Sequence, residues 1–217
     1  MKKVTAILLA FIMMLTLMAG CTGGAPVDNT EPSQETTAPT QAPTQPTQTT
    51  TEPTQPLMGT AESSAARLLA KIWTQYGEDE RFATYGGTVE HSVSDAPGDL
   101  DMANTEELIT KYLLPADQLS NVENGGSLVH LMNSNIFTAA AFKLKDGTDA
   151  RAVAKALRDN IQKAQWICGQ PEHLLVADAE GHIVMAFAAK ENLDNFRQKM
   201  TAAYPSANII YDEAVTA

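Results

Sequence analysis

Residues 142–188 read "FKLKDGTDARAVAKALRDNIQKAQWICGQPEHLLVADAEGHIVMAFA". The stretch opens on the end of a run in which apolar and polar residues alternate, which is typical of a β-strand, and "DG" closes that run. Residues 149–165 then carry apolar side chains at helical spacing, and Thr148 is the expected N-cap of this helix. The apolar stripe is expected to comprise Val153, Leu157, Ile161 and Ala164.

Two apolar runs follow the helix, at 173–178 and 182–188, with a tight turn around Glu180-Gly181. Runs of this length on either side of a Gly-containing turn predict a β-hairpin. One hairpin face would carry Leu174, Val176, Ile183, Met185 and Phe187, and we expect that face to meet the core.

The pattern continues on both sides of this stretch. Residues 135–145 alternate, with Ile136 expected on the same buried strand face as Phe142, and residues 191–204 and 208–211 read as a second amphipathic helix and a last strand. The order β-α-β-β-α-β is the split βαβ signature of ferredoxin-like folds. The sequence therefore predicts an α+β domain, a two-layer sandwich with an antiparallel sheet and a ferredoxin-like core.

An N-terminal helix and a hairpin are expected before this core. Residues 64–77 place apolar side chains on one helical face. Residues 122–132 read as two strands around a turn at Asn124-Gly125, and a weaker hairpin is expected around Gly86-Gly87. Asn104 is expected to cap a short helix that Pro115 ends.

Cys168, His173 and His182 fall close together in sequence, which raises the question of a thiol or metal site. Cys168 follows the C-terminal end of a predicted helix, where the helix dipole disfavours a thiolate, so a buried structural cysteine is expected. If Ala179-Glu180 forms the hairpin turn, His173 pairs with Ala186. The two histidines then share the more solvated sheet face but lie roughly 13 Å apart, too far to bind one metal ion.

No other motif in the chain indicates catalysis. The sequence contains no Gly-x-Ser-x-Gly elbow, phosphate-binding loop, His-Glu-x-x-His or Cys-x-x-Cys motif. His91 and His130 belong to other segments and have no obvious partners. Many carboxylates are present, but no pattern singles out an acid/base pair. We predict no catalytic, cofactor-binding or metal-binding residues.

The N-terminus carries an export signal. "MKK" precedes the apolar run "VTAILLAFIMMLTLMAG", which predicts a signal peptide over residues 1–20, although the run is also about as long as a minimal membrane span. The ending "LMAGC" resembles the bacterial lipobox, with Met18 where Leu is usual. That resemblance implies that Cys21 is lipidated with diacylglycerol (palmitate-type chains) and becomes the new N-terminus. Cys168 is then left without an intrachain disulfide partner.

Residues 21–57 are predicted to form the lipidated cysteine and a disordered tether. Residues 22–57 hold seven of the eleven prolines and eleven threonines, with no aromatic or basic residue. Such a segment cannot bury enough apolar surface to fold, and its 36 residues could reach roughly 110 Å at most in a polyproline conformation. Whether it is O-glycosylated stays open. Residues 58–217 are expected to form a single domain.

The charge balance excludes some partners. The net charge is −11, and removing Lys2 and Lys3 leaves 13 basic against 26 acidic residues. An acidic protein is repelled by nucleic acid and by anionic lipid headgroups, so we predict no nucleic-acid partner. The lipid on Cys21, rather than charge, would hold the protein at the membrane.

The stretch 142–188 also resembles a known family in its strand ending Lys-Asp-Gly, its amphipathic helix, and Trp166-Ile167-Cys168 before a strand-turn-strand. The resemblance is to uncharacterised lipoproteins of Gram-positive anaerobes that share a domain of unknown function, and it covers about residues 66–190. It implies an exported, lipid-anchored α+β domain and transfers no site residues.

These features predict a lipoprotein on the outer face of the cytoplasmic membrane. Its domain would be a non-catalytic binding or interaction module whose ligand is a cell-envelope protein or polymer. The alternative is an extracytoplasmic enzyme that acts on envelope material through unidentified carboxylates. A deep pocket with converging acids would favour the enzyme, whereas an apolar patch would favour a partner surface. The oligomeric state stays open.

Overall fold

The computed structural model describes residues 63–167 and 169–216. The predicted signal peptide, Cys21, the tether and Cys168 lie outside the described residues. No helix within the described ranges is both long and apolar enough to cross a membrane.

Helices and strands alternate along this part of the chain much as the periodicity predicts. The elements are α1 (Ser64–Trp73), β1 (Thr84–Gly86), η1 (Val89–His91), β2 (Val93–Ser94), β3 (Gly98–Leu100), α2 (Thr105–Thr110), η2 (Ala116–Asn121), β4 (Val122–His130), β5 (Phe137–Leu144), α3 (Ala150–Lys163), β6 (His173–Ala179), β7 (His182–Ala188), α4 (Lys190–Ala203) and β8 (Asn208–Ala214).

All the strands belong to one antiparallel sheet, in the order β2-β1-β4-β5-β7-β6-β8, and β3 also pairs with β4. From β5 onward the chain order β-α-β-β-α-β is confirmed. The ferredoxin-like strand order is wrong. Strand β8 lies beside β6, whereas the split βαβ arrangement would place the last strand beside β5.

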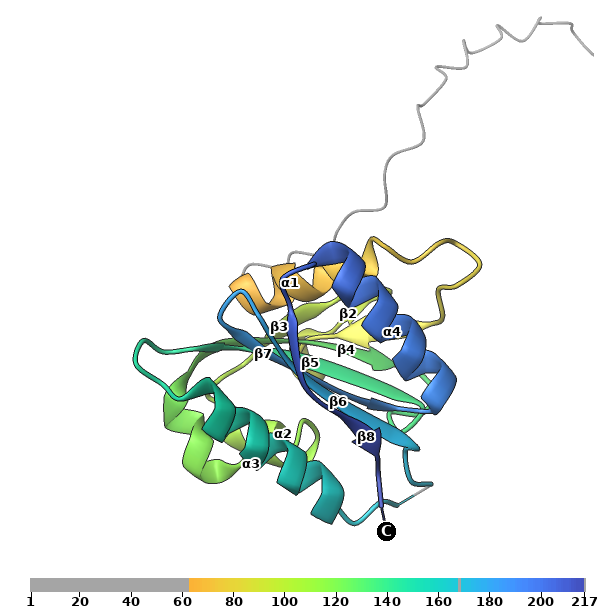
Figure 1. Cartoon of the computed structure of the whole chain (residues 1–217). Coiled ribbons are helices and arrows are strands. Elements are labelled where there is room, and N and C mark those ends of the chain that lie inside the picture. Colours follow the sequence, from red (N-terminus) through yellow and green to blue (C-terminus); the bar gives the residue numbers. More distant parts are fainter. Residues whose placement is uncertain (1–62, 168, 217) are drawn as a thin grey trace, which may run out of the picture. The chain divides into compact units, whose positions relative to one another are not determined.

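The position of β8 decides how many layers the domain has. Both helical connections, β5 to β6 and β7 to β8, step across the sheet in the same direction. Because β5 and β7 are antiparallel, right-handed connections place α3 and α4 on opposite faces. Figure 1 shows α1 and α4 on one side of the sheet and α2 and α3 on the other. The domain therefore has three layers, and the two-layer prediction is wrong.

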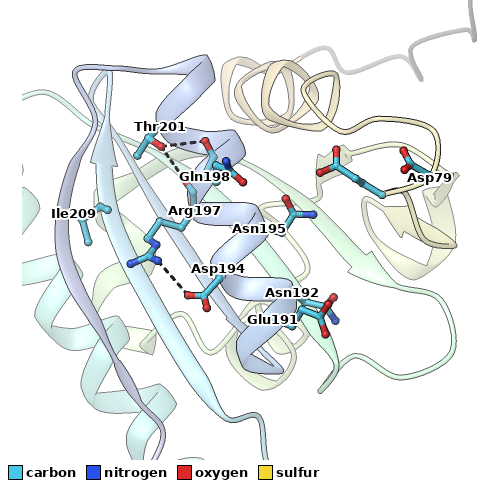
Figure 2. Close-up of a pocket in the computed structure, with 10 residues that line it drawn as sticks. Asp79, Glu191, Asn192, Asp194, Asn195, Arg197, Gln198, Thr201 and Ile209 are labelled. Carbon is cyan, nitrogen blue, oxygen red and sulfur yellow. Dashed lines mark hydrogen bonds and ion pairs between the residues drawn. The ribbon is translucent and has the colours of Figure 1, made fainter.

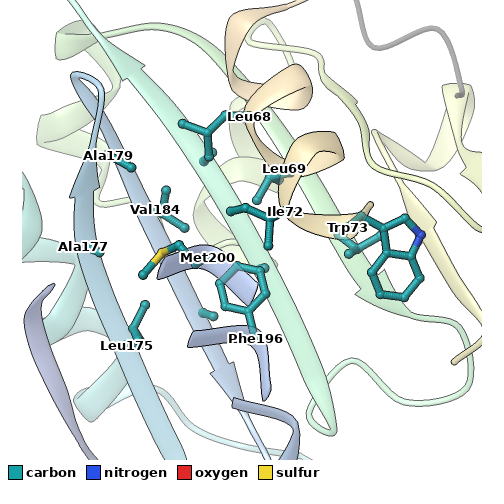
Figure 3. Close-up of a cluster of buried hydrophobic side chains, with 14 of the residues drawn as sticks. Leu68, Leu69, Ile72, Trp73, Leu175, Ala177, Ala179, Val184, Phe196 and Met200 are labelled. Atoms are coloured by element: carbon teal, nitrogen blue, oxygen red, sulfur yellow. The ribbon is translucent and has the colours of Figure 1, made fainter. Parts of the chain in front are cut away.

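Each face of the sheet has its own hydrophobic core. Under α1 and α4 the buried side chains are mostly aromatic or aliphatic. Figure 3 labels several of those that these two helices contribute: Leu68, Leu69, Ile72, Trp73, Phe196 and Met200. The α3 stripe of Val153, Leu157 and Ile161 packs on the other face, against Leu174, Val176, Ile183, Met185 and Phe187. Within the described ranges, the residues of both cores lie between positions 65 and 215.

Strand β4 is continuous where a hairpin turn at Asn124-Gly125 was expected. The glycines there serve packing instead of a turn. A Cβ on Gly126 would lie 2.5 Å from the Ala66 Cα, so the absence of a side chain lets α1 lie directly on the strand. The expected hairpin around Gly86-Gly87 is present as β1 and β2.

Two helix caps illustrate local chemistry. Asn104 caps α2, as predicted, by accepting a hydrogen bond from the Glu107 N–H. The α3 cap is Asp149 rather than the predicted Thr148, because the Asp149 carboxylate accepts from the N–H groups of Arg151 and Ala152. The expected stripe ends at Ile161, since α3 stops before Ala164.

Candidate functional site

A polar hollow of about 850 Å³ lies over the outer side of α4. Figure 2 shows that α4 supplies most of its side chains, while Asp79 comes from the segment after α1. Its charged groups are largely paired. Lys199 Nζ lies 2.6 Å from Glu80 Oε2, and Arg197 contacts Asp194 and Asp212. The hydrogen bond from Lys199 holds the pKa of Glu80 below its usual value.

These ion pairs bear on the enzyme alternative. A carboxyl that acts as a general acid near neutral pH needs a raised pKa. In the described part of the chain, the carboxyl pKa values that shift all move downward, through hydrogen bonds to Lys or Arg: Glu80, Asp159, Asp194 and Glu213. Lowered carboxyl pKa values with this cause are typical of surface carboxylates in ion pairs.

A second hollow, of about 680 Å³, lies beside Trp166, near the C-terminal end of α3. We call it the Trp166 groove. Four separate segments line it: Thr110, Lys111 and Leu113 at and after the end of α2, residues 132–135 between β4 and β5, residues 164–167 after α3, and Phe187 of β7.

Hydrogen bonds shape the loops around the Trp166 groove. His130 Nδ1 accepts from the N–H of Met132 at 3.2 Å, which turns the chain as it leaves β4. Asn135 Nδ2 donates to the Gly169 carbonyl, joining the β4–β5 loop to the segment after α3. The Trp166 ring packs edge-on against Phe187, with centroids 4.9 Å apart. The groove is thus built from loops that the sheet and α3 hold in place.

The groove has an apolar rim. Met132 and Ile167 are each 81% exposed, and Leu131, next to Met132, is 56% exposed. Ile136, predicted to face the core from a strand, lies before β5 and is 37% exposed. Several large apolar side chains gathered on one surface are typical of a binding site. In addition, the Trp166 Nε1–H is buried without a hydrogen-bond partner, which is an unfavourable state for an indole.

The Trp166 groove is also distinct in charge. None of the residues that line it is an Asp or a Glu, and Lys111 is its one cation. Lys111 Nζ lies 2.8 Å from Glu107 Oε1 and sits over the Tyr85 and Tyr112 rings. Burial alone would lower the pKa of Lys111, but Tyr112 and the hydrogen bond to Glu107 outweigh it and raise the pKa. Lys111 is therefore a fixed positive charge at the groove edge.

The histidines singled out in the sequence do not form a site. His173 pairs with Ala188 and His182 with Ala179, because the turn is Glu180-Gly181 and not Ala179-Glu180. The two histidines share a sheet face, as predicted, but lie six positions apart along the strands, roughly 20 Å. In the described ranges, no three His, Cys, Asp or Glu side chains lie close enough together to hold a metal ion.

The prediction that these histidines lie on a solvated face is wrong for His182, which is 6% exposed. Helix α1 covers it, and its Nε2 lies 2.9 Å from Ser64 Oγ. This pair resembles a nucleophile and base, but the N–H groups that follow Ser64 are already bonded: Ala65 to Asn124 and Ala66 to Ser63. No oxyanion could use them, so the contact is structural.

Sequence reasoning missed the Trp166 groove, although Trp166 and Ile167 stand in the stretch that carries the family resemblance. The available signal was "LMNSNI" at 131–136, where three large apolar residues frame a polar loop. Comparison with protein families, curated proteins and solved structures gave no match to this chain.

Proposed function

We propose that the protein is a lipoprotein anchored through Cys21 on the outer face of the cytoplasmic membrane of a Gram-positive cell, as in the family it resembles. Its domain is a non-catalytic interaction module, and the Trp166 groove is the surface that docks a cell-envelope protein or polymer. The observation that carries this proposal is the apolar, carboxylate-free rim of the groove, with Met132 and Ile167 exposed beside Trp166.

The groove lies at the other end of the strands from Ser63, the first described residue, and this supports display. The chain enters the domain at Ser63 and Ser64, and Ser64 contacts His182, the first residue of β7. Phe187, in the groove, is five residues further along the same strand, about 17 Å away. A tether attached at one end of the strands leaves the groove at the other end free to meet a partner.

Lipidation is tested by metabolic labelling with radioactive palmitate in the native cell. We expect the full chain to incorporate label and Cys21→Ser to lose it, because the thioether forms only on the cysteine. Equal labelling of both chains would contradict the anchor.

Docking is tested by cosedimentation of the 58–217 domain with isolated cell envelopes. We expect binding by the wild-type domain and at least about tenfold weaker binding by Met132→Glu, since a carboxylate is costly to bury in an apolar contact. Val89→Glu is the control, because Val89 is 72% exposed but lies on η1, outside the groove. Protease treatment of the envelopes separates a protein ligand from a polymer. Equal sedimentation of Met132→Glu and Val89→Glu would overturn the docking role.

A further inference from the structure

The Trp166 groove has the shape of a surface that can pair with itself. Met132 and Ile167 both line a hollow of about 680 Å³, and each is 81% exposed. A two-fold axis places the same patch of both partners face to face, so that a protruding residue on one copy meets the hollow on the other. One patch thus carries both the projections and the depression that a symmetric contact requires.

The polar residues of the groove are also self-complementary. Asn133, Asn135 and Gln165 line it alongside the apolar side chains. A side-chain amide holds both donors and an acceptor, so it can bond to the same residue of a second copy, whereas a carboxylate or an ammonium facing its own copy is repelled. The one charged lining residue, Lys111, is paired with Glu107 at 2.8 Å, so two copies do not bring unpaired ammonium groups together. Amides around an apolar centre are therefore suited to a partner with the same surface.

The Trp166 groove differs from the rest of the domain in its lack of negative charge. Residues 63–217 contain 13 basic and 21 acidic residues, so two copies repel one another overall. The repulsion is smallest where carboxylates are absent, as along the Trp166 groove. The hollow over α4 presents Asp79, Glu80, Glu191 and Asp194, and would bring acids against acids.

We propose that the occupant of the Trp166 groove is the Trp166 groove of a second copy of this chain, which forms a two-fold dimer. This inference rests on the proposed function, because it names the partner of the same surface. In each copy Ser64 contacts His182, at the end of β7 far from the groove. Each tether spans up to roughly 110 Å when extended, so both anchors reach one membrane, where confinement raises the effective concentration of each copy for the other.

Sedimentation equilibrium of the 58–217 domain over a concentration series tests the dimer. We expect a monomer–dimer equilibrium that tightens as salt is added, because salt screens the repulsion between the acidic copies. Met132→Glu and Ile167→Glu should each raise the dimer Kd by at least about tenfold, since each brings two carboxylates into one apolar contact. Val89→Glu should leave the Kd unchanged, and circular dichroism should show all three variants folded.

A wild-type domain that stays monomeric at its highest soluble concentration overturns the dimer, as does a dimer insensitive to Met132→Glu and Ile167→Glu. The two proposals fail separately. If the domain is monomeric but Met132→Glu still loses envelope binding, the groove docks another partner and only the dimer is wrong. If the domain dimerises through the groove but does not bind envelopes, the envelope ligand is wrong.

Discussion

His182 is held between two elements by its two ring nitrogens. Nδ1 lies 3.0 Å from the Glu180 carbonyl oxygen, and Nε2 lies 2.9 Å from Ser64 Oγ. A neutral ring that donates from Nδ1 to the carbonyl presents Nε2 as an acceptor to the Ser64 hydroxyl, which also lies 3.2 Å from Asn124 Oδ1. Burial lowers the His182 pKa below its ordinary value of 6.5, and the Lys143 charge on the facing strand adds to the effect.

This lowered pKa predicts a pH dependence of stability. Between the folded-state pKa and 6.5, the unfolded chain binds more protons at His182 than the folded chain does. The free energy of unfolding should therefore be highest above pH 6.5, fall as the pH is lowered through this window, and lose nothing more from His182 below the folded-state pKa. The measurement is urea unfolding at a series of pH values between 5 and 7.5, above the range in which most carboxyls titrate.

His182→Gln identifies the source of this slope. We expect the substitution to lower the free energy of unfolding by about 1 kcal/mol at pH 7.5, through weaker hydrogen bonds, and to flatten the pH dependence. His91→Gln, at an exposed position, should keep the slope. A slope unchanged in His182→Gln would show that another group causes it.

At the scale of elements, the contact of α1 with β4 depends on the absence of a side chain at Gly126. A Cβ there would lie 2.5 Å from both the Cα and the N of Ala66, and backbone atoms of a packed helix cannot move aside without displacing it. The same helix places Leu68, Leu69 and Ile72 in the core.

We expect Gly126→Ala to lower the free energy of unfolding by about 3 kcal/mol, because the added methyl group forces α1 away from the sheet. Gly125→Ala is the matched control on the same strand. Its Cβ would meet the Leu100 side chain at 3.1–3.3 Å, and we expect a loss of about 1 kcal/mol as that side chain shifts. The measurement is urea unfolding of both variants. Equal losses in the free energy of unfolding would show that α1 can adjust its position.

In the whole molecule, the core residues that the structure describes lie between positions 65 and 215. A tether rich in Pro, Thr and Gln adds no apolar side chains that these cores require. We therefore expect the 58–217 domain and a chain that begins at residue 22 to have the same free energy of unfolding, within about 0.5 kcal/mol. A domain that is less stable by 1 kcal/mol or more in urea unfolding would show that the tether packs on the fold.

The local elements could be predicted from the sequence, including both amphipathic helices, the 173–188 hairpin and the Asn104 cap. These features follow from periodicity and from side chains a few residues apart. The shift of the cap from Thr148 to Asp149 lies within the usual uncertainty of a helix boundary. The shared sheet face of His173 and His182 was also predictable, because strands alternate with a period of two.

The position of β8, the number of layers and the Trp166 groove depend on contacts between segments far apart in the chain, so they could not be predicted from the sequence. Strand order depends on which distant strands pair, and a chain with the order β-α-β-β-α-β can place its last strand at either edge. Once β8 lies beside β6, α4 must cover the face opposite α3, which is the face on which α1 covers His182. The groove then forms where four segments that are far apart in the sequence come together. Residue spacing along the chain does not predict such a contact.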